Sequence, residues 1–148
     1  MKQINLKQFG YDLKIPSMHD GKSFERFIAE YLKKRGVYFL RLYDSRSVGG
    51  LAHSQPADFL VWHKNKLIYI ECKTTQRDCI SLNDYQPRQL KEAMQASERG
   101  ILYLTIVNFN GIIMFEDLEK LIELCKCHDC KTLHKAIFIP FFELNDYL

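Results

Sequence analysis

Two short apolar runs on either side of a polar turn constrain the fold of this chain more than any other feature. The runs occupy residues 57–62 and 67–73, and the turn occupies residues 63–66. Runs of this length and composition around a short polar turn predict a β-hairpin. A turn centred in the middle of that segment pairs Asp58 of the first run with Glu71 of the second.

This pairing places two carboxylates opposite each other within otherwise apolar strands. Lys73 lies on the same face as Glu71, because side chains alternate along a strand. Like charges in opposite positions destabilise a sheet, and burial without a partner costs still more free energy. Something must therefore offset the repulsion between the two carboxylates. It is either a divalent cation, which prefers oxygen ligands, or Lys73 alone in a structural salt bridge. The spacing leaves both explanations open, and an ammonium group beside a metal-bound water also suits phosphodiester hydrolysis.

The elements around the hairpin predict one α/β domain. Apolar residues at helical spacing follow Asp20, a suitable N-cap, and stop at Gly36. Trp62 and Tyr69 are expected in the core rather than as platforms on which bases stack. The other expected elements are a strand over 37–43, a loop over 44–55, a helix over 84–98, a strand pair over 101–107 and 112–115, a helix over 116–124, and an apolar segment over 136–142 that is an edge strand or a contact surface.

Composition agrees with a globular domain in a reducing compartment. The 148 residues are 47% hydrophobic and 26% charged, which excludes a disordered chain, a coiled coil and a collagen-like fibre. No stretch approaches the roughly 18 apolar residues of a membrane span, and the first residues lack the apolar segment of a secretory signal. The five cysteines do not form the pattern of a disulfide framework. We therefore expect a cytoplasmic protein.

The hairpin residues resemble a known group of enzymes. Pro56-Ala57-Asp58 and Glu71-Cys72-Lys73 are similar to the motifs of the PD-(D/E)XK nuclease superfamily, with one extra residue before the aspartate. The nearer resemblance, over residues 20–142, is to RecU-type Holliday junction resolvases, including phage-encoded relatives. The additional segments that carry it are Gly21-Lys22-Ser23-Phe24-Glu25, Tyr69 to Thr75, Gln89-Leu90 and Gly100-Ile101.

The resemblance implies a role for each matching residue. Asp58 and Glu71 would ligate Mg²⁺, or Mn²⁺ in its place, together with the backbone carbonyl of Cys72. Lys73 would position the attacking water or stabilise the transition state. Glu25 would approach the same cation directly or through a water.

The resemblance also implies that Gln89 orients Lys73 or a water, although Gln86, one helical turn away, could serve instead. Lysine and arginine outnumber acidic residues in the first third of the chain. The serines, arginine and glycines of residues 45–50 suit contact with a nucleic-acid backbone. The candidate DNA-binding residues are Lys22, Arg41, Ser45, Arg46 and Ser47.

A second cluster could bind a metal of another kind. Cys125, Cys127, Cys130 and His134 could form a tetrahedral zinc site, but they lack the usual paired spacing. Reduced thiols are the alternative, and we expect no tightly held zinc.

The sequence thus predicts an N-terminal arm over 1–20 and a nuclease domain over 21–148. The expected fold is restriction-endonuclease-like, with a mixed central β-sheet flanked by helices. The expected function is that of a Mg²⁺-dependent, structure-specific DNA endonuclease, a Holliday junction resolvase in DNA recombination in a bacterial cell or a phage-infected host. It would act as a homodimer, because the four-way junction is twofold symmetric. The alternatives are a restriction- or repair-type endonuclease on the same core and an inert DNA-binding module.

Overall fold

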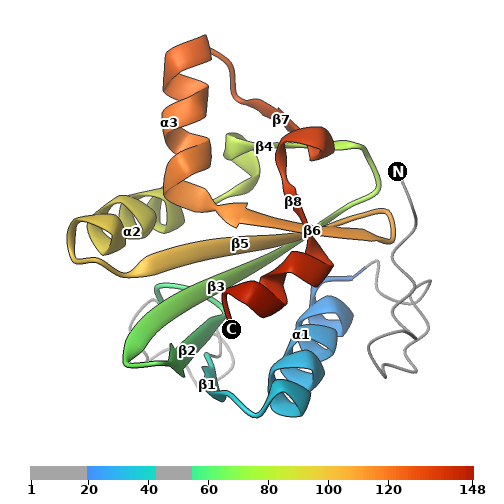
Figure 1. Ribbon diagram of the computed structural model, residues 1–148. Coiled ribbons are helices and arrows are strands. Elements are labelled where there is room, and N and C mark those ends of the chain that lie inside the picture. Colours follow the sequence, from blue (N-terminus) through green and yellow to red (C-terminus); the bar gives the residue numbers. More distant parts are fainter. Residues whose placement is uncertain (1–19, 43–54) are drawn as a thin grey trace, which may run out of the picture.

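The computed structural model describes residues 20–42 and 55–148 of the chain. These residues form a central sheet with helices on both of its faces (Figure 1). The elements are α1 (Gly21–Arg35), β1 (Tyr38–Arg41), β2 (Phe59–His63), β3 (Lys66–Thr75), β4 (Cys79–Ser81), α2 (Pro87–Glu98), β5 (Leu102–Phe109), β6 (Ile112–Asp117), α3 (Leu118–His128), β7 (Thr132–His134) and β8 (Ile139–Pro140). Short 3₁₀ helices are η4 (Leu82–Asp84), η5 (Lys135–Ile137) and η6 (Phe141–Asp146).

The central sheet has six strands in the order β1-β2-β3-β5-β6-β8, and β4 and β7 form a separate two-stranded sheet. β3 and β5 are parallel and are connected through α2, whereas all other neighbours in the six-stranded sheet are antiparallel. The expected fold class, a mixed sheet flanked by helices, is confirmed.

The predicted hairpin is present as β2 and β3, with the expected register of Leu60 opposite Tyr69. The two turn residues, Lys64 and Asn65, have φ angles of 50° and 62°. A two-residue turn with both residues in the left-handed region matches the twist of the two strands, which fixes the register. The strand β2 begins at Phe59, one residue later than the predicted pairing of Asp58 with Glu71 requires.

The first helix begins and ends where the sequence predicts. The Asp20 side chain accepts a hydrogen bond from the Ser23 backbone N–H at 2.8 Å and so caps α1. Gly36 ends the helix with a φ of 71°, a conformation that a residue without Cβ adopts without strain.

Other element boundaries differ from the sequence-based ones for local reasons. The helix expected from residue 84 begins at Pro87, which occupies the first helical position because it has no N–H to donate. The helix expected from residue 116 begins at Leu118, because β6 continues through Glu116 and Asp117 then caps α3. The last apolar segment supplies the edge strand β8, which pairs with β6.

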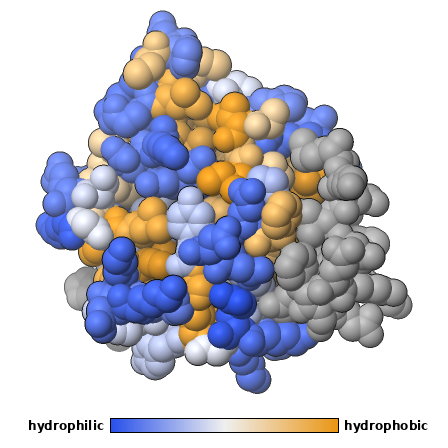
Figure 2. Space-filling view, in the orientation of Figure 1, coloured by the Kyte–Doolittle hydropathy of each residue, from blue (hydrophilic) through white to orange (hydrophobic). Residues whose placement is uncertain are grey.

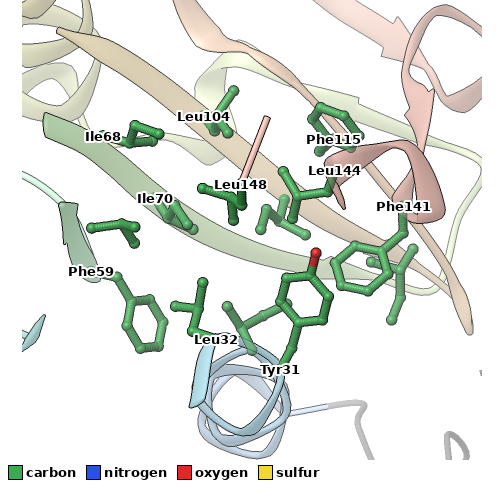
Figure 3. Packing of buried hydrophobic residues seen from close by; sticks show 14 of the residues in the cluster. Tyr31, Leu32, Phe59, Ile68, Ile70, Leu104, Phe115, Phe141, Leu144 and Leu148 are labelled. Carbon is green, nitrogen blue, oxygen red and sulfur yellow. The ribbon is translucent and has the colours of Figure 1, made fainter. Parts of the chain in front are cut away.

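The core is divided between the two faces of the sheet. On one face α1 and η6 pack onto the strands, with Tyr31 and Phe141 in ring contact at 4.8 Å (Figure 3). On the other face α2, α3, β4 and β7 cover β5 and β6, where Tyr103 and Phe109 are buried. Polar side chains cover much of the surface in view, with apolar ones exposed between them (Figure 2).

Two expectations about single residues have different outcomes. Tyr69 packs against Tyr103 with the rings 5.7 Å apart, as expected for a core residue. Trp62 is 51% exposed, so its assignment to the core is wrong. The Trp62 side chain points to the face of β2 that is opposite α1, and none of the described helices covers that face at this point.

In the ranges 20–42 and 55–148 no helix is long and apolar enough to cross a membrane. The arm predicted for residues 1–20 lies outside the described residues, apart from Asp20.

Candidate active site

Asp58 lies immediately before β2 and interacts with the backbone of β3. Its N–H donates to the carbonyl of Ile70 at 3.0 Å, and its Oδ2 accepts from the N–H of Cys72 at 2.8 Å. The Cys72 N–H is therefore bonded to the Asp58 carboxylate and not to a backbone carbonyl of the neighbouring strand. The predicted cross-strand pair with Glu71 is corrected accordingly: Asp58 is held at the end of the ladder, against the strand that carries Glu71.

Glu71 is buried, with 3% of its surface exposed. Its Oε1 accepts a hydrogen bond from Nε2 of Gln89 at 2.6 Å and lies 3.4 Å from Nζ of Lys73. Its Oε2 is buried and has no hydrogen-bond partner among the residues that the structure describes. An unpartnered buried carboxylate oxygen is costly, which leaves this atom in need of a cation or a donor.

Gln89, in the first turn of α2, forms hydrogen bonds with both Glu71 and Lys73. Its Oε1 accepts from Nζ of Lys73 at 3.2 Å and from the Gln86 N–H at 2.9 Å. Gln86 is exposed at the N-terminus of the helix. Of the two glutamines that the sequence offers, Gln89 is the one whose side chain faces Glu71 and Lys73.

Tyr85 is a member of the site that sequence reasoning missed. Nζ of Lys73 lies 5.0 Å from the centre of its ring, and its hydroxyl shares a 2.6 Å hydrogen bond with Thr105 on β5. Both residues are buried. The only signal in the sequence is a tyrosine shortly before the helix, which does not distinguish it from other core tyrosines.

Glu25, on α1, forms an ion pair with Arg41 at 3.0 Å. Its negative charge also raises the pKa of Asp58 and of Glu71, so α1 brings a third carboxylate toward the pair. Arg41, which the sequence assigned to DNA contact, is thus engaged within the protein. Lys22 is exposed on α1. The other predicted DNA contacts, Ser45, Arg46 and Ser47, lie outside the described residues.

The two carboxyl groups resist ionisation. Burial, and then the neighbouring charge of Glu71, raise the pKa of Asp58 well above its usual range. Burial also raises the pKa of Glu71, against the opposing effect of the Lys73 ammonium. The Cys72 thiol, also removed from water, has a raised pKa. A cation between the carboxylates would relieve this repulsion.

The donors at the site fit a hard divalent cation. The carboxylates of Asp58 and Glu71 offer only oxygen, the ligand type that Mg²⁺ and Mn²⁺ prefer, and Oε2 of Glu71 has no competing partner in the described part of the chain. Within residues 20–42 and 55–148, no three His, Cys, Asp or Glu side chains stand together as a ready metal site. That holds for Cys125, Cys127, Cys130 and His134 as well, and all five cysteines are free thiols.

A mixed sheet that gathers Asp, Glu and Lys at adjoining strands, beside a helix glutamine, defines a nuclease of the PD-(D/E)XK class. A sequence model of the archaeal Holliday junction resolvase family (Hjc) matches residues 17–131. The chain belongs to this family and is a structure-specific DNA endonuclease, a Holliday junction resolvase.

One solved structure supports the fold. The Hjc Holliday junction resolvase of Archaeoglobus fulgidus, from an archaeal hyperthermophile, is similar with a TM-score of 0.59 and 16% identity. The similarity covers 84% of this chain and 99% of that one. The nuclease D212 of a fusselovirus has a TM-score of 0.47 and 13% identity, over 91% of this chain and 94% of that one. No curated protein matches the chain.

The family found is the archaeal one, whereas the motifs had suggested RecU-type enzymes and a bacterial or phage-infected cell. The superfamily and the activity are as expected; the RecU likeness remains a resemblance.

Proposed function

We propose that this resolvase hydrolyses phosphodiester bonds of four-way junctions at the site formed by Asp58, Glu71 and Lys73, with Mg²⁺ as cofactor and Mn²⁺ as a possible substitute. One observation carries the proposal: Oε2 of Glu71 is buried without a hydrogen-bond partner in the described residues, close to a second carboxylate with a raised pKa. A structural salt bridge with Lys73 would use only Oε1 of Glu71 and would leave Oε2 unexplained.

Asp58, Glu71 and the carbonyl of Cys72 would hold the cation. When bound, the cation lowers the pKa of a coordinated water and neutralises charge on the phosphate. Lys73 keeps its ammonium group near Glu71, where it can donate to the attacking water or to a phosphate oxygen. Glu25, whose charge acts on both Asp58 and Glu71, would approach the same cation directly or through a water.

Gln89 and Tyr85 are positioning residues for Lys73. Gln89 accepts a hydrogen bond from the ammonium group, and the Tyr85 ring lies beneath it. Lys73 therefore has contacts on two sides, which limits the rotamers that a long side chain would otherwise adopt. We infer that this restraint directs the ammonium group toward the scissile phosphate.

The remaining parts of the proposal concern partners. Lys22, Arg41 and the segment that contains Ser45, Arg46 and Ser47 would contact the DNA backbone. Two copies of the chain would act together, because resolution requires two symmetric nicks. The free thiols support action in a reducing cytoplasm. The RecU-like motifs are explained by the shared nuclease core.

Three single variants test the proposal: Asp58→Asn, Glu71→Gln and Lys73→Ala. Each is expected to fold and to bind junction DNA, because affinity comes from phosphate contacts spread over the surface. Cleavage of a labelled junction in Mg²⁺ is expected to fall by at least ~10²-fold, the scale of a lost transition-state contact. Lys91→Ala, an exposed lysine on α2, is the matched control and should cleave normally.

Metal dependence is measured with the same substrate. Mg²⁺ or Mn²⁺ should support nicking, EDTA should abolish it, and Ca²⁺ should allow binding with little turnover. Undiminished cleavage in EDTA would refute the proposal. So would variants that unfold yet keep full activity per folded molecule, since the cluster would then be a structural salt bridge.

A further inference from the structure

The outer strands of the sheet carry an exposed apolar face. Tyr38 and Leu40 of β1 are 63% and 48% exposed, and Trp62 of β2 is 51% exposed. Tyr38 is opposite Trp62 in the register, and Leu40 is opposite Leu60. These four residues, Tyr38, Leu40, Leu60 and Trp62, are called the aromatic face below.

The aromatic face is not the outside of an ordinary surface strand. The intervening residues Phe39, Phe59 and Val61 point to the opposite side and belong to the core beneath α1. The strands β1 and β2 are therefore apolar on both sides, although the described residues pack on only one side. Large exposed aromatic side chains that gather on one face mark an interaction site.

The face is continuous with the active site along the sheet. Leu60 and Trp62 are opposite Tyr69 and Leu67 on β3, and Glu71 and Lys73 follow Tyr69 on the same side of that strand. Leu67 and Glu71 are four residues apart, which is about 13 Å along a strand. Nucleotides in a stacked strand are about 3.4 Å apart, so the distance corresponds to about four nucleotides.

The charges around the face select the kind of partner. Lys64 lies in the hairpin turn and Lys66 at the start of β3, both near Trp62 in the chain, and Lys33 and Lys34 lie in the last turn of α1, which leads into β1. All four lysines are exposed. A second copy docked symmetrically on this face would bring two such sets of cations together, whereas a nucleic acid supplies the complementary charge.

We propose that the aromatic face stacks on bases that the branch point of a junction leaves open, while the flanking lysines hold the adjacent phosphates. Base faces are buried inside a continuous duplex and become available where strands exchange, so the contact favours branched over linear DNA. Aromatic side chains beside a cationic track are the usual platform for unpaired bases. The inference rests on the proposed function, since it assigns the junction-reading surface to the same endonuclease.

Trp62 is the only tryptophan in the chain, so its fluorescence reports on this face alone. Titration with an unlabelled four-way junction in EDTA should quench the emission, and linear duplex of equal length should quench it much less. No cleavage occurs in EDTA under the proposed chemistry, so the measurement is one of binding only. Equal quenching by both DNAs, or none at saturation, overturns the inference. A blue shift that depends on protein concentration and not on DNA does the same, because a second copy would then cover Trp62.

Variants measured by anisotropy of labelled DNA give the second test. Trp62→Ala should weaken junction binding by about 5- to 150-fold, the effect of losing one stacked base, and should leave duplex binding nearly unchanged. Trp62→Phe should restore most of the affinity. Phe142→Ala, which removes a similarly exposed aromatic from η6, is the matched control and should bind as the wild type does. Equal losses for junction and duplex with Trp62→Ala would refute the inference.

Cleavage of the junction in Mg²⁺ by the wild-type protein is measured in parallel. Metal-dependent cleavage without selective quenching overturns the role of the aromatic face and leaves the proposed function intact. Selective quenching without metal-dependent cleavage supports the face and refutes the catalytic proposal.

Discussion

The side-chain amide of Gln89 donates a 2.6 Å hydrogen bond to Oε1 of Glu71. The orientation of the amide is fixed from its other end, where Oε1 of Gln89 accepts from the Gln86 N–H at 2.9 Å. The helix terminus thus determines which atom of Gln89 meets the carboxylate. Oε1 of Glu71 is occupied by this bond, and only Oε2 is left for a cation.

Replacement of Gln89 by leucine should reduce cleavage and spare DNA binding. The change removes hydrogen bonds to two charged groups, Glu71 and Lys73, and bonds of this kind contribute about 1.5–3 kcal/mol each. If one such contribution is lost in the transition state, kcat on a junction should fall by roughly 10- to 100-fold. Single-turnover cleavage at saturating protein measures this.

Gln86→Ala is the control for that prediction, because it removes an amide side chain from the exposed N-cap residue of α2, three residues before Gln89. It should cleave normally. A larger loss with Gln86→Ala than with Gln89→Leu would mean that the helix start, and not the Gln89 side chain, determines activity.

Much of the site could be predicted because it depends on local rules. A symmetric polar turn fixes the hairpin register, and alternation along β3 then places Glu71 and Lys73 on one face. The position of Asp58 could not be obtained in this way. Its carboxylate binds the Cys72 N–H and ends the ladder, and periodicity does not reveal where a side chain replaces a backbone acceptor.

The sequence also did not reveal which parts of the sheet are covered by helices. Trp62 and Tyr69 both lie in apolar strands, yet Tyr69 is packed against Tyr103 and Trp62 is exposed. The difference arises because α2 packs near β5, away from the outer strands. The path of a crossover helix is a property of the tertiary structure, and no pattern within β2 encodes it.

The cysteine cluster should hold no zinc. Cys125 and Cys127 both lie on α3, with Cys125 buried and Cys127 exposed, and the described residues contain no group of three ligands. Elemental analysis of the purified protein should find no stoichiometric zinc, and Cys127→Ser should leave the melting temperature unchanged. Bound zinc together with a destabilised Cys127→Ser variant would contradict this.

Tyr85 should contribute through its ring and not through its hydroxyl. Tyr85→Phe keeps the ring next to Lys73, whereas Tyr85→Leu removes a cation–π contact worth about 0.5–2 kcal/mol. We expect Tyr85→Phe to cleave nearly as well as the wild type and Tyr85→Leu to have a kcat lower by about 2- to 30-fold at unchanged DNA affinity.

An NMR measurement separates positioning by Tyr85 from a general packing effect. The Lys73 side-chain protons next to the Tyr85 ring should be shifted upfield in the wild type and in Tyr85→Phe, and not in Tyr85→Leu. Thr105→Val removes the hydrogen-bond partner of the hydroxyl and should retain the shift. A loss of activity in Thr105→Val as large as that in Tyr85→Leu would assign the effect to the hydroxyl.

The raised pKa values of Asp58 and Glu71 make the stability of the metal-free protein depend on pH in a definite direction. In the unfolded chain these groups lose their protons near their usual values, 3.8 and 4.5, whereas in the folded protein they keep them to higher pH. At pH values between the usual and the raised pKa values, the folded state therefore binds more protons than the unfolded state. The pair therefore lowers the free energy of unfolding as pH rises through that window, and the full loss is present above the raised values.

Mg²⁺ should reverse this loss, because a cation binds the ionised carboxylates and competes with protons for them. Thermal unfolding of the wild type should show a larger increase in melting temperature on addition of Mg²⁺ at pH 8 than at pH 5. Asp58→Asn removes one of the two interacting charges, so its metal-free stability should fall less between these pH values, and its response to Mg²⁺ should be smaller. An equal Mg²⁺ effect at both pH values, in both proteins, would show that the cation binds elsewhere and that the carboxylate pair is not its site.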